Sequence, residues 1–234
     1  MLGVIGGMGP AASSLFYDMI TEETGAERDQ DNLDLILISR SSMPDRTAAI
    51  LSGDRNKIEK VRGQLLADAR LLEGAGCRAL AVTCNTAHYF VDMIEEEISI
   101  PFIHMIRETA CRVAEEKPGK KIAILATDGT IRTELYQREC HKRGLDTLVP
   151  EAPVQKLVMA EIYDRIKAGK KADRPMWAAI EKAIREQGAD GAILACTELS
   201  VVKQELALDS FYFDPLRILA QASLAYCRRY GDVR

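Results

Sequence analysis

Short apolar runs alternate with helical segments along most of this chain, and that alternation restricts the folds it can adopt. The runs LDLILIS (33–39), KIAILAT (121–127) and GAILAC (191–196) are apolar almost throughout. Strands of a parallel sheet have this composition when helices cover both faces of the sheet, because both sides of each strand are then buried. The sequence therefore predicts an α/β fold with mostly parallel sheets in three layers.

The apolar pattern also places the individual elements. The segment 56–75 has apolar residues at helical spacing, and SRSSMPDRT (39–47) has the composition of a loop. We expect strands at 2–6, 33–39, 79–83, 100–103, 121–127, 146–149, 191–196 and 211–213. We expect helices at 11–24, 56–75, 86–97, 106–116, 131–143, 154–168, 174–187 and 215–229.

Two parts of the chain resemble each other. VIGGMGPAASSLFYDM (4–19) can be aligned with ILATDGTIRTELYQRE (124–139), and each reads as a strand, a glycine turn and a helix. Further along, AVTCNTA and AILACTE also correspond. This weak internal repeat predicts two similar halves, each with one cysteine after a core strand.

Composition and charge exclude several classes of function. The net charge is −4 and no basic stripe is present, so we expect no nucleic-acid partner. No apolar run approaches the ~20 residues of a membrane span, and MLGVIGGMGP lacks the features of a secretion signal. No cysteine or histidine group has zinc spacing, so we expect no metal site. These features predict a cytoplasmic protein without a membrane partner.

Cys84 and Cys196 each lie where a core strand ends and polar residues begin a helix. In an open parallel sheet, ligands bind beyond the carboxyl ends of the strands. A helix N-terminus lowers the pKa of a nearby thiol, and holding a thiolate at pH 7 costs roughly 2 kcal/mol from a normal pKa of about 8.5. Each position can therefore hold a thiolate that acts as a base, although a cysteine that ends a strand can also be an ordinary small core residue.

Two such thiols on opposite sides of one cleft suit a particular reaction. One thiolate removes a proton from a carbon atom, and the opposite thiol returns a proton to the other face. The result is inversion of a stereocentre without a cofactor. A single cysteine beside a histidine would instead indicate acyl transfer.

Five motifs extend over nearly the whole chain and resemble those of the aspartate/glutamate racemase superfamily. They are IGGMGP (5–10), PDRTAAIL (44–51), CNTAH (84–88), IYDRIKAG (162–169) and CTEL (196–199). Glutamate racemases of cell-wall synthesis usually carry a histidine after the second Cys-Thr. This chain has Glu198 there, and it is therefore most similar to the cofactor-independent aspartate racemases.

The resemblance implies two α/β domains with a cleft between them, and a homodimer. The first domain would comprise residues 1–108 plus 210–234 and carry Cys84, and the second would comprise 109–209 and carry Cys196. The two cysteines would be the acid/base pair of an amino-acid racemase that needs no cofactor. Cys196 would take the proton from the L-enantiomer, and Cys84 would take it from the D-enantiomer.

The resemblance also implies which residues bind a small amino-acid substrate, with aspartate the first expectation. Arg46 and Lys167 would lie near its carboxylates, and an arginine can hold a carboxylate with two parallel hydrogen bonds. Backbone or side-chain donors around the two cysteines would stabilise the charge that develops as the proton leaves. The remaining expected contacts are Met8, Gly9, Asn85, Thr86, Thr127, Thr130, Thr197 and Glu198. His88 would either orient the Cys84 thiolate or serve as a polar residue of its helix.

Several alternatives stay open from the sequence. The loop around Arg40 departs from the family pattern, so glutamate, a broader range of amino acids or another carbon acid (a hydantoin, malonate or maleate) are further candidate substrates. The turn Gly7–Ala12 fits G-x-G-x-x-A, and Arg40 follows the second strand where a 2′-phosphate would lie, as in an NADP-binding oxidoreductase. A non-catalytic amino-acid sensor is a further alternative, although binding alone does not need two opposed thiols.

Overall fold

The computed structural model describes residues 1–230 of the chain, and in them eight parallel strands form two four-stranded sheets. The first sheet has the order β2-β1-β3-β4 and the second has the order β6-β5-β7-β8. The strands of the first sheet are β1 (Leu2–Gly6), β2 (Leu35–Ser39), β3 (Ala79–Val82) and β4 (Phe102–Ile103). The second sheet consists of β5 (Lys121–Ala126), β6 (Asp146–Leu148), β7 (Gly191–Ala195) and β8 (Tyr212–Phe213). The two sheets share one topology, so the predicted α/β fold with two similar halves is confirmed.

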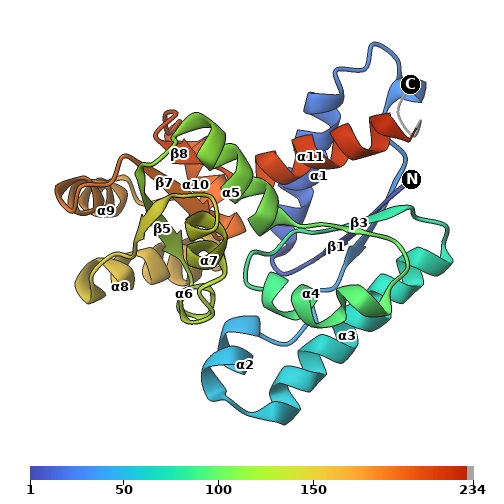
Figure 1. Cartoon of the computed structure of the whole chain (residues 1–234), viewed down its shortest axis with the longest axis horizontal. Coiled ribbons are helices and arrows are strands. Elements are labelled where there is room, and N and C mark those ends of the chain that lie inside the picture. Colours follow the sequence, from blue (N-terminus) through green and yellow to red (C-terminus); the bar gives the residue numbers. More distant parts are fainter. Residues whose placement is uncertain (231–234) are drawn as a thin grey trace.

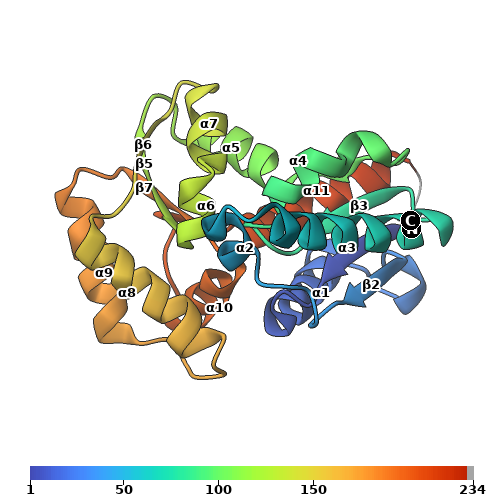
Figure 2. The same cartoon turned by 90° about the horizontal axis from the view of Figure 1, so that it is seen from below.

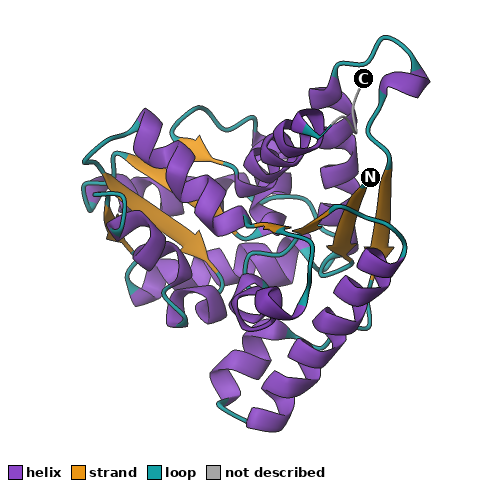
Figure 3. Ribbon diagram, turned by 45° about the vertical axis from the view of Figure 1, so that its right-hand side comes forward, coloured by secondary structure: helices purple, strands orange, loops and turns teal. Residues whose placement is uncertain are grey.

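Helices cover both faces of each sheet (Figures 1 and 3). Around the first sheet these are α1 (Pro10–Thr24), α2 (Arg46–Ser52), α3 (Arg55–Gly74) and α4 (His88–Ile94), with short 3-10 turns at Asp29–Asp31 and Glu95–Glu97. Around the second sheet they are α6 (Asp128–Arg132), α7 (Leu135–His141), α8 (Ala152–Ala160), the π-helix η3 (Glu161–Ile166), α9 (Arg174–Glu186) and α10 (Thr197–Leu206). Helices α5 (Met105–Glu116) and α11 (Pro215–Arg229) pack on each other between the two halves.

The strands bury their side chains alternately on the two faces, as the continuous apolar runs predict. In β5, Ile122, Ile124 and Ala126 join the core cluster on one face, and Ala123 and Leu125 join the cluster on the other. The first sheet divides in the same way. This three-layer packing exposes the carboxyl ends of all strands at one edge of each sheet.

Helix α10 lies outside the expected helices, the expected helix 86–97 ends as a 3-10 turn, and three further elements differ from the expected boundaries. The expected loop 39–47 ends in α2, because Asp45 caps that helix by accepting the Ala48 N–H at 2.7 Å and Gly53 ends it with a φ of 62°. The expected helix 131–143 is divided by Glu134, which has a φ of 53°. The expected helix 154–168 changes into the π-helix η3 before Lys167.

The proposed domain boundaries need one adjustment. β8 pairs with β7, so residues 212 and 213 belong to the second sheet rather than to the first domain. After β8, α11 packs on α1 as well as on α5. Residues 231–234, the last part of the proposed first domain, lie outside the described residues. None of the helices within residues 1–230 is long and apolar enough to cross a membrane.

Candidate active site

The two cysteines singled out by the sequence line one cavity between the two halves. Cys84 lies two residues after the end of β3, and Cys196 lies directly after β7 and is the N-cap of α10. β3 and β7 occupy the same position in their sheets, so the two thiols come from equivalent places in the repeat. Each cysteine is only 6% exposed. The cavity measures about 10 Å³, which is room for roughly one water molecule.

Residues from both halves complete the wall of this inner cavity. The first half contributes the turn after β1 and the start of α2, and the second half contributes the start of α6 and the end of η3. Besides the two cysteines, the wall consists of Met8, Asp45, Arg46, Thr47, Thr86, Thr127, Tyr163, Lys167 and Glu198. Figure 2 shows α2 of the first half lying against α6 of the second.

The Cys196 thiol donates a hydrogen bond to Glu198. The distance from its sulfur to Glu198 Oε2 is 2.9 Å, and the other carboxylate oxygen pairs with Lys167. Burial raises the pKa of Cys196 well above its usual value, and the Glu198 carboxylate raises it further. The net shift is upward, so the expected lowering of this thiol's pKa is wrong for the structure described. Cys196 is therefore a neutral thiol here.

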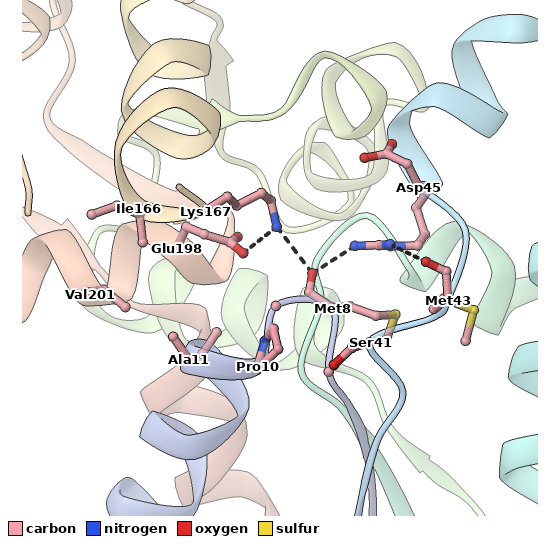
Figure 4. A pocket seen from close by; sticks show the side chains of 14 residues that line it. Met8, Pro10, Ala11, Ser41, Met43, Asp45, Ile166, Lys167, Glu198 and Val201 are labelled. Carbon is pink, nitrogen blue, oxygen red and sulfur yellow. Dashed lines mark hydrogen bonds and ion pairs between the residues drawn. The ribbon is translucent and has the colours of Figure 1, made fainter. Parts of the chain in front are cut away.

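Two cations meet at the carbonyl oxygen of Met8. Arg46 Nη2 donates to that oxygen at 2.8 Å, and Lys167 Nζ donates to it at 3.3 Å (Figure 4). Burial alone would lower the pKa of Lys167, but the neighbouring Glu198 carboxylate is the main group that raises it, to about 12. Burial also opposes the charge of Arg46, and the neighbouring Cys84 is the main group that raises its pKa. Both cations predicted from the resemblance therefore lie at the cavity and stay charged.

Threonine hydroxyls form a linked cluster beside Cys84. Thr86 Oγ1 lies 3.0 Å from Thr127 Oγ1 and 2.8 Å from Thr130 Oγ1, and Thr47 donates to Thr127 at 3.2 Å. Three of these side chains line the inner cavity, and Thr130 lies behind them. The cluster joins α2, α6 and the turn after β3, so it ties the two halves together at the cavity.

Three other expected contacts lie outside the inner wall. Asn85 Oδ1 accepts a hydrogen bond from Tyr136 at 2.5 Å, while its buried Nδ2 has no partner among the described residues. Thr197 Oγ1 donates across the halves to the carbonyl oxygen of Thr83 at 3.4 Å. A Cβ on Gly9 would lie 3.1 Å from Glu198 Oε1, so the absence of a side chain there makes room for the carboxylate.

His88 holds the backbone of Cys84 and not its thiol. Its Nδ1 lies 2.9 Å from the Cys84 carbonyl oxygen, and its Nε2 accepts the Met105 N–H at 3.2 Å. Because Nε2 is an acceptor, the ring proton is on Nδ1. Burial lowers the pKa of His88 to about 3, so the ring is neutral. The role of orienting a thiolate is replaced by that of fixing the turn after β3.

Arg40 and the glycine turn do not form a phosphate site. Arg40 is held by the buried Asp68 of α3, with Nη2 to Oδ1 at 2.5 Å and Nε to Oδ2 at 3.1 Å, and it lines neither cavity at the site. Gly7 has a φ of 83°, and a Cβ there would lie 2.3 Å from the Arg40 nitrogen. Close packing of the turn against the chain after β2 thus explains its glycine.

A second, larger cavity adjoins the inner one. This outer chamber measures about 330 Å³. Five residues line both spaces and form the neck between them: Met8, Asp45, Arg46, Lys167 and Glu198. Among residues 1–230, no group of three or more histidine, cysteine, aspartate or glutamate side chains is placed to hold a metal ion.

A model of the Asp/Glu/hydantoin racemase family matches residues 5–223 of the sequence. The chain belongs to this family. Membership in the Asp/Glu/hydantoin racemases confirms the resemblance drawn from the five motifs, and it leaves the dinucleotide-binding alternative without support. The description of the family names aspartate, glutamate and hydantoin.

Individual relatives differ in the substrates that they are named for. The broad specificity amino-acid racemase RacX of Bacillus subtilis is 26% identical over 231 residues, which cover 96% of this chain and 97% of RacX. A Picrophilus torridus aspartate racemase has 27% identity and a TM-score of 0.75, covering 98% of this chain and 94% of its own. The glutamate racemase of Aquifex pyrophilus is 26% identical over 169 residues, 68% of this chain and 61% of that protein.

Three residues of the inner wall are not among the contacts predicted from the sequence. Asp45, Thr47 and Tyr163 line the cavity, and the Tyr163 hydroxyl lies 3.4 Å from Asp45 Oδ2. All three occur in the motifs PDRTAAIL and IYDRIKAG that carried the resemblance. The two motifs therefore contain the signal, although none of these three side chains is a cation that would indicate a carboxylate site.

Proposed function

We propose that this protein is a racemase of an acidic amino acid, with aspartate as its main substrate, and that Cys84 and Cys196 are its two bases. The observation that carries the proposal is that both thiols line a single cavity, one from each half. Two groups on opposite sides of one carbon can remove a proton from one face and deliver a proton to the other.

The protons that leave and reach the substrate balance between these two thiols. A Cys84 thiolate beside the Arg46 guanidinium takes the α-proton of one enantiomer, which the family resemblance implies is the D-enantiomer. The neutral Cys196 thiol then gives its proton to the opposite face of the carbanion. The products are the other enantiomer, a Cys84 thiol and a Cys196 thiolate, and the return reaction reverses each step. Neither step requires a cofactor.

Charge that builds up on the substrate needs hydrogen-bond donors. When the α-proton leaves, negative charge spreads onto the α-carboxylate. Thr86 and Thr127 present hydroxyls to the inner cavity, and the amide of Asn85 has a free donor next to Cys84. Donors fixed in position before the reaction stabilise this charge without having to reorient.

Arg46 and Lys167 support a substrate with a second carboxylate. Both donate to the Met8 carbonyl oxygen, and a neutral carbonyl is a weaker acceptor for a cation than a carboxylate is. A side-chain carboxylate of the substrate would replace Met8 as their acceptor. This exchange favours aspartate over an amino acid with a short uncharged side chain.

A broader substrate range is the second candidate. It is favoured by the similarity to RacX, which is named a broad specificity racemase and matches over nearly its full length. Glutamate and hydantoins also belong in any substrate panel because of the family's description and its glutamate racemase members.

The test is proton exchange and inversion by the purified protein without added pyridoxal phosphate. Incubated with L-aspartate in D₂O, it should replace the α-hydrogen with deuterium and produce D-aspartate, measured by mass spectrometry and chiral chromatography. Cys84→Ala and Cys196→Ala should each abolish racemisation. The exposed Cys111 provides the control, and Cys111→Ala should keep wild-type turnover. Wild-type turnover in both active-site variants would refute the proposal.

The oligomeric state is a separate proposal. We infer a homodimer from the family resemblance, and sedimentation equilibrium of the purified chain tests it. A mass of one chain at all concentrations would contradict the dimer without bearing on the chemistry.

A further inference from the structure

The outer chamber has no role in proton transfer between the two thiols. It begins at the neck formed by Met8, Asp45, Arg46, Lys167 and Glu198 and measures about 330 Å³, against about 10 Å³ for the inner cavity. A water molecule occupies about 30 Å³ in the liquid, so the chamber has room for a chain of several non-hydrogen atoms. A substrate whose α-carbon lies between the thiols would extend a long side chain through the neck into this space.

The wall beyond the neck carries no charged side chain among the described residues that form it. It consists of Gly7, Gly9, Pro10, Ala11, Ala12, Ser41, Met43, Ile166 and Val201. In Figure 4, Ala11, Ile166 and Val201 lie on one side of the pocket and Ser41 and Met43 lie on the other. A side chain that ends in this region would meet apolar groups and one hydroxyl, so an uncharged, mainly apolar end fits it.

The charges of the neck are balanced within the protein. Arg46 and Lys167 are cations, and Asp45 and Glu198 supply two carboxylates. Lys167 pairs with Glu198, and both cations also donate to the Met8 carbonyl oxygen. An uncharged side chain can therefore pass without leaving a buried charge unpaired, whereas the aspartate side chain is short enough to end at the neck itself.

We propose that the outer chamber is a side-chain subsite for α-amino acids with long, unbranched, uncharged side chains. This inference rests on the proposed racemase function and adds a second substrate class to aspartate. The structure assigns Ala11 and Val201 to the wall that would decide between long and short side chains.

The experiment compares L-norleucine, L-alanine and L-aspartate by α-hydrogen exchange in D₂O. The wild-type protein should exchange norleucine faster than alanine, because only norleucine reaches the chamber. Ala11→Phe and Val201→Phe fill the chamber, and each should lower the ratio of kcat/KM for norleucine to kcat/KM for aspartate about tenfold or more. Ser14 is exposed on the same helix as Ala11 and lines neither cavity, so Ser14→Phe is the matched control and should leave the ratio unchanged.

Three other outcomes would contradict the subsite, and one of them would also contradict the racemase proposal. Exchange of aspartate without exchange of norleucine would overturn the subsite and leave the racemase proposal standing. An unchanged substrate ratio in both filling variants would likewise overturn it. No exchange with any of the three amino acids would overturn the racemase proposal and the subsite together.

Discussion

The carboxylate of Glu198 determines the protonation state of the Cys196 thiol. It accepts the Cys196 S–H at 2.9 Å and is itself paired with Lys167. A proton can pass from this thiol to Glu198 Oε2 without a bridging water, which would leave a Cys196 thiolate beside a neutral carboxyl group. Glu198 is therefore placed both to raise the pKa of Cys196 and to take its proton when the thiol has to act as a base.

Glu198→Gln separates these two effects. Removing the negative charge should lower the pKa of Cys196, because that charge is one of the causes that raise it. The thiolate, followed by its ultraviolet absorbance against Cys196→Ala, should then appear at lower pH than in the wild-type protein. Racemisation should nevertheless fall about 100-fold, since the side chain no longer accepts a proton.

Glu205→Gln, an exposed position on the same helix, is the control and should change neither measurement. A rate close to wild type in Glu198→Gln would show that Cys196 does not need this acceptor.

Single residues of the site were predictable only where their neighbours in the sequence indicate their place in the fold. Cys84 and Cys196 stand out because each follows an apolar strand in an aligned repeat. The direction of the Cys196 pKa shift was not predictable, because it depends on burial of the thiol and on the orientation of the Glu198 carboxylate. The partner of Arg40 was hidden as well, since Asp68 is 28 positions further along the chain.

At the scale of elements, the turn between β3 and α4 depends on a buried neutral histidine. His88 donates to the Cys84 carbonyl oxygen and accepts from the Met105 N–H, so it joins the turn that carries the first thiol to the start of α5. Strands and long helices were predictable from periodicity. The end of α2, the break at Glu134 and the π-helix were not, because they depend on single backbone angles and on packing between distant segments.

Protonation of this histidine links the turn to pH. The pKa of His88 is lowered to about 3 in the folded protein from 6.5, so below pH 6.5 the unfolded chain binds a proton that the folded protein does not. The free energy of unfolding should therefore fall as pH decreases, by up to about 1.4 kcal/mol per pH unit. Urea unfolding between about pH 5 and 6.5 measures this slope, and the difference between the wild-type protein and a His88 variant isolates the part that belongs to His88.

His88→Asn should be less stable near neutral pH and should lose this part of the slope. His141 is exposed, and His141→Asn should keep the wild-type slope. Equal slopes in the wild-type protein and His88→Asn would mean that His88 titrates normally.

At the scale of the whole molecule, the site exists only where the two halves touch. Helix α2 contacts α6, and Thr47 and Thr127, which are 80 positions apart, are joined by a hydrogen bond across the cavity. The internal repeat predicted the two halves. The pattern of neighbouring residues in the sequence could not predict which side chains of one half contact those of the other. Because the inner cavity holds about one water, its walls, which come from both halves, must move apart for an amino acid to enter.

Gly129→Ala tests this closure. A Cβ at Gly129 would lie 2.9 Å from the Thr47 Cα, so a methyl group there should hold α2 and α6 apart. We expect kcat/KM for aspartate to fall about 10- to 100-fold, because a shift of less than 1 Å misaligns the thiols with the α-carbon. Gly63 of α3 has no atom within 4 Å of the corresponding Cβ position.

Gly63→Ala is therefore the matched control, and it should keep full activity while stabilising the helix by about 1 kcal/mol. Full activity in Gly129→Ala would show that the two halves do not need to approach this closely.

The unlike neighbours of the two sulfur atoms, Arg46 near one and Glu198 on the other, have a consequence for the proposed racemase. Mirror-image amino acids have the same free energy in water, so the equilibrium mixture contains equal amounts whatever the protein contributes. The different surroundings of the two sulfur atoms can change kcat and KM for each enantiomer, but the two kcat/KM values must stay equal. The enantiomer with the lower KM must therefore have a kcat that is lower by the same factor. The asymmetry decides which enantiomer saturates the protein at the lower concentration, and never which one accumulates.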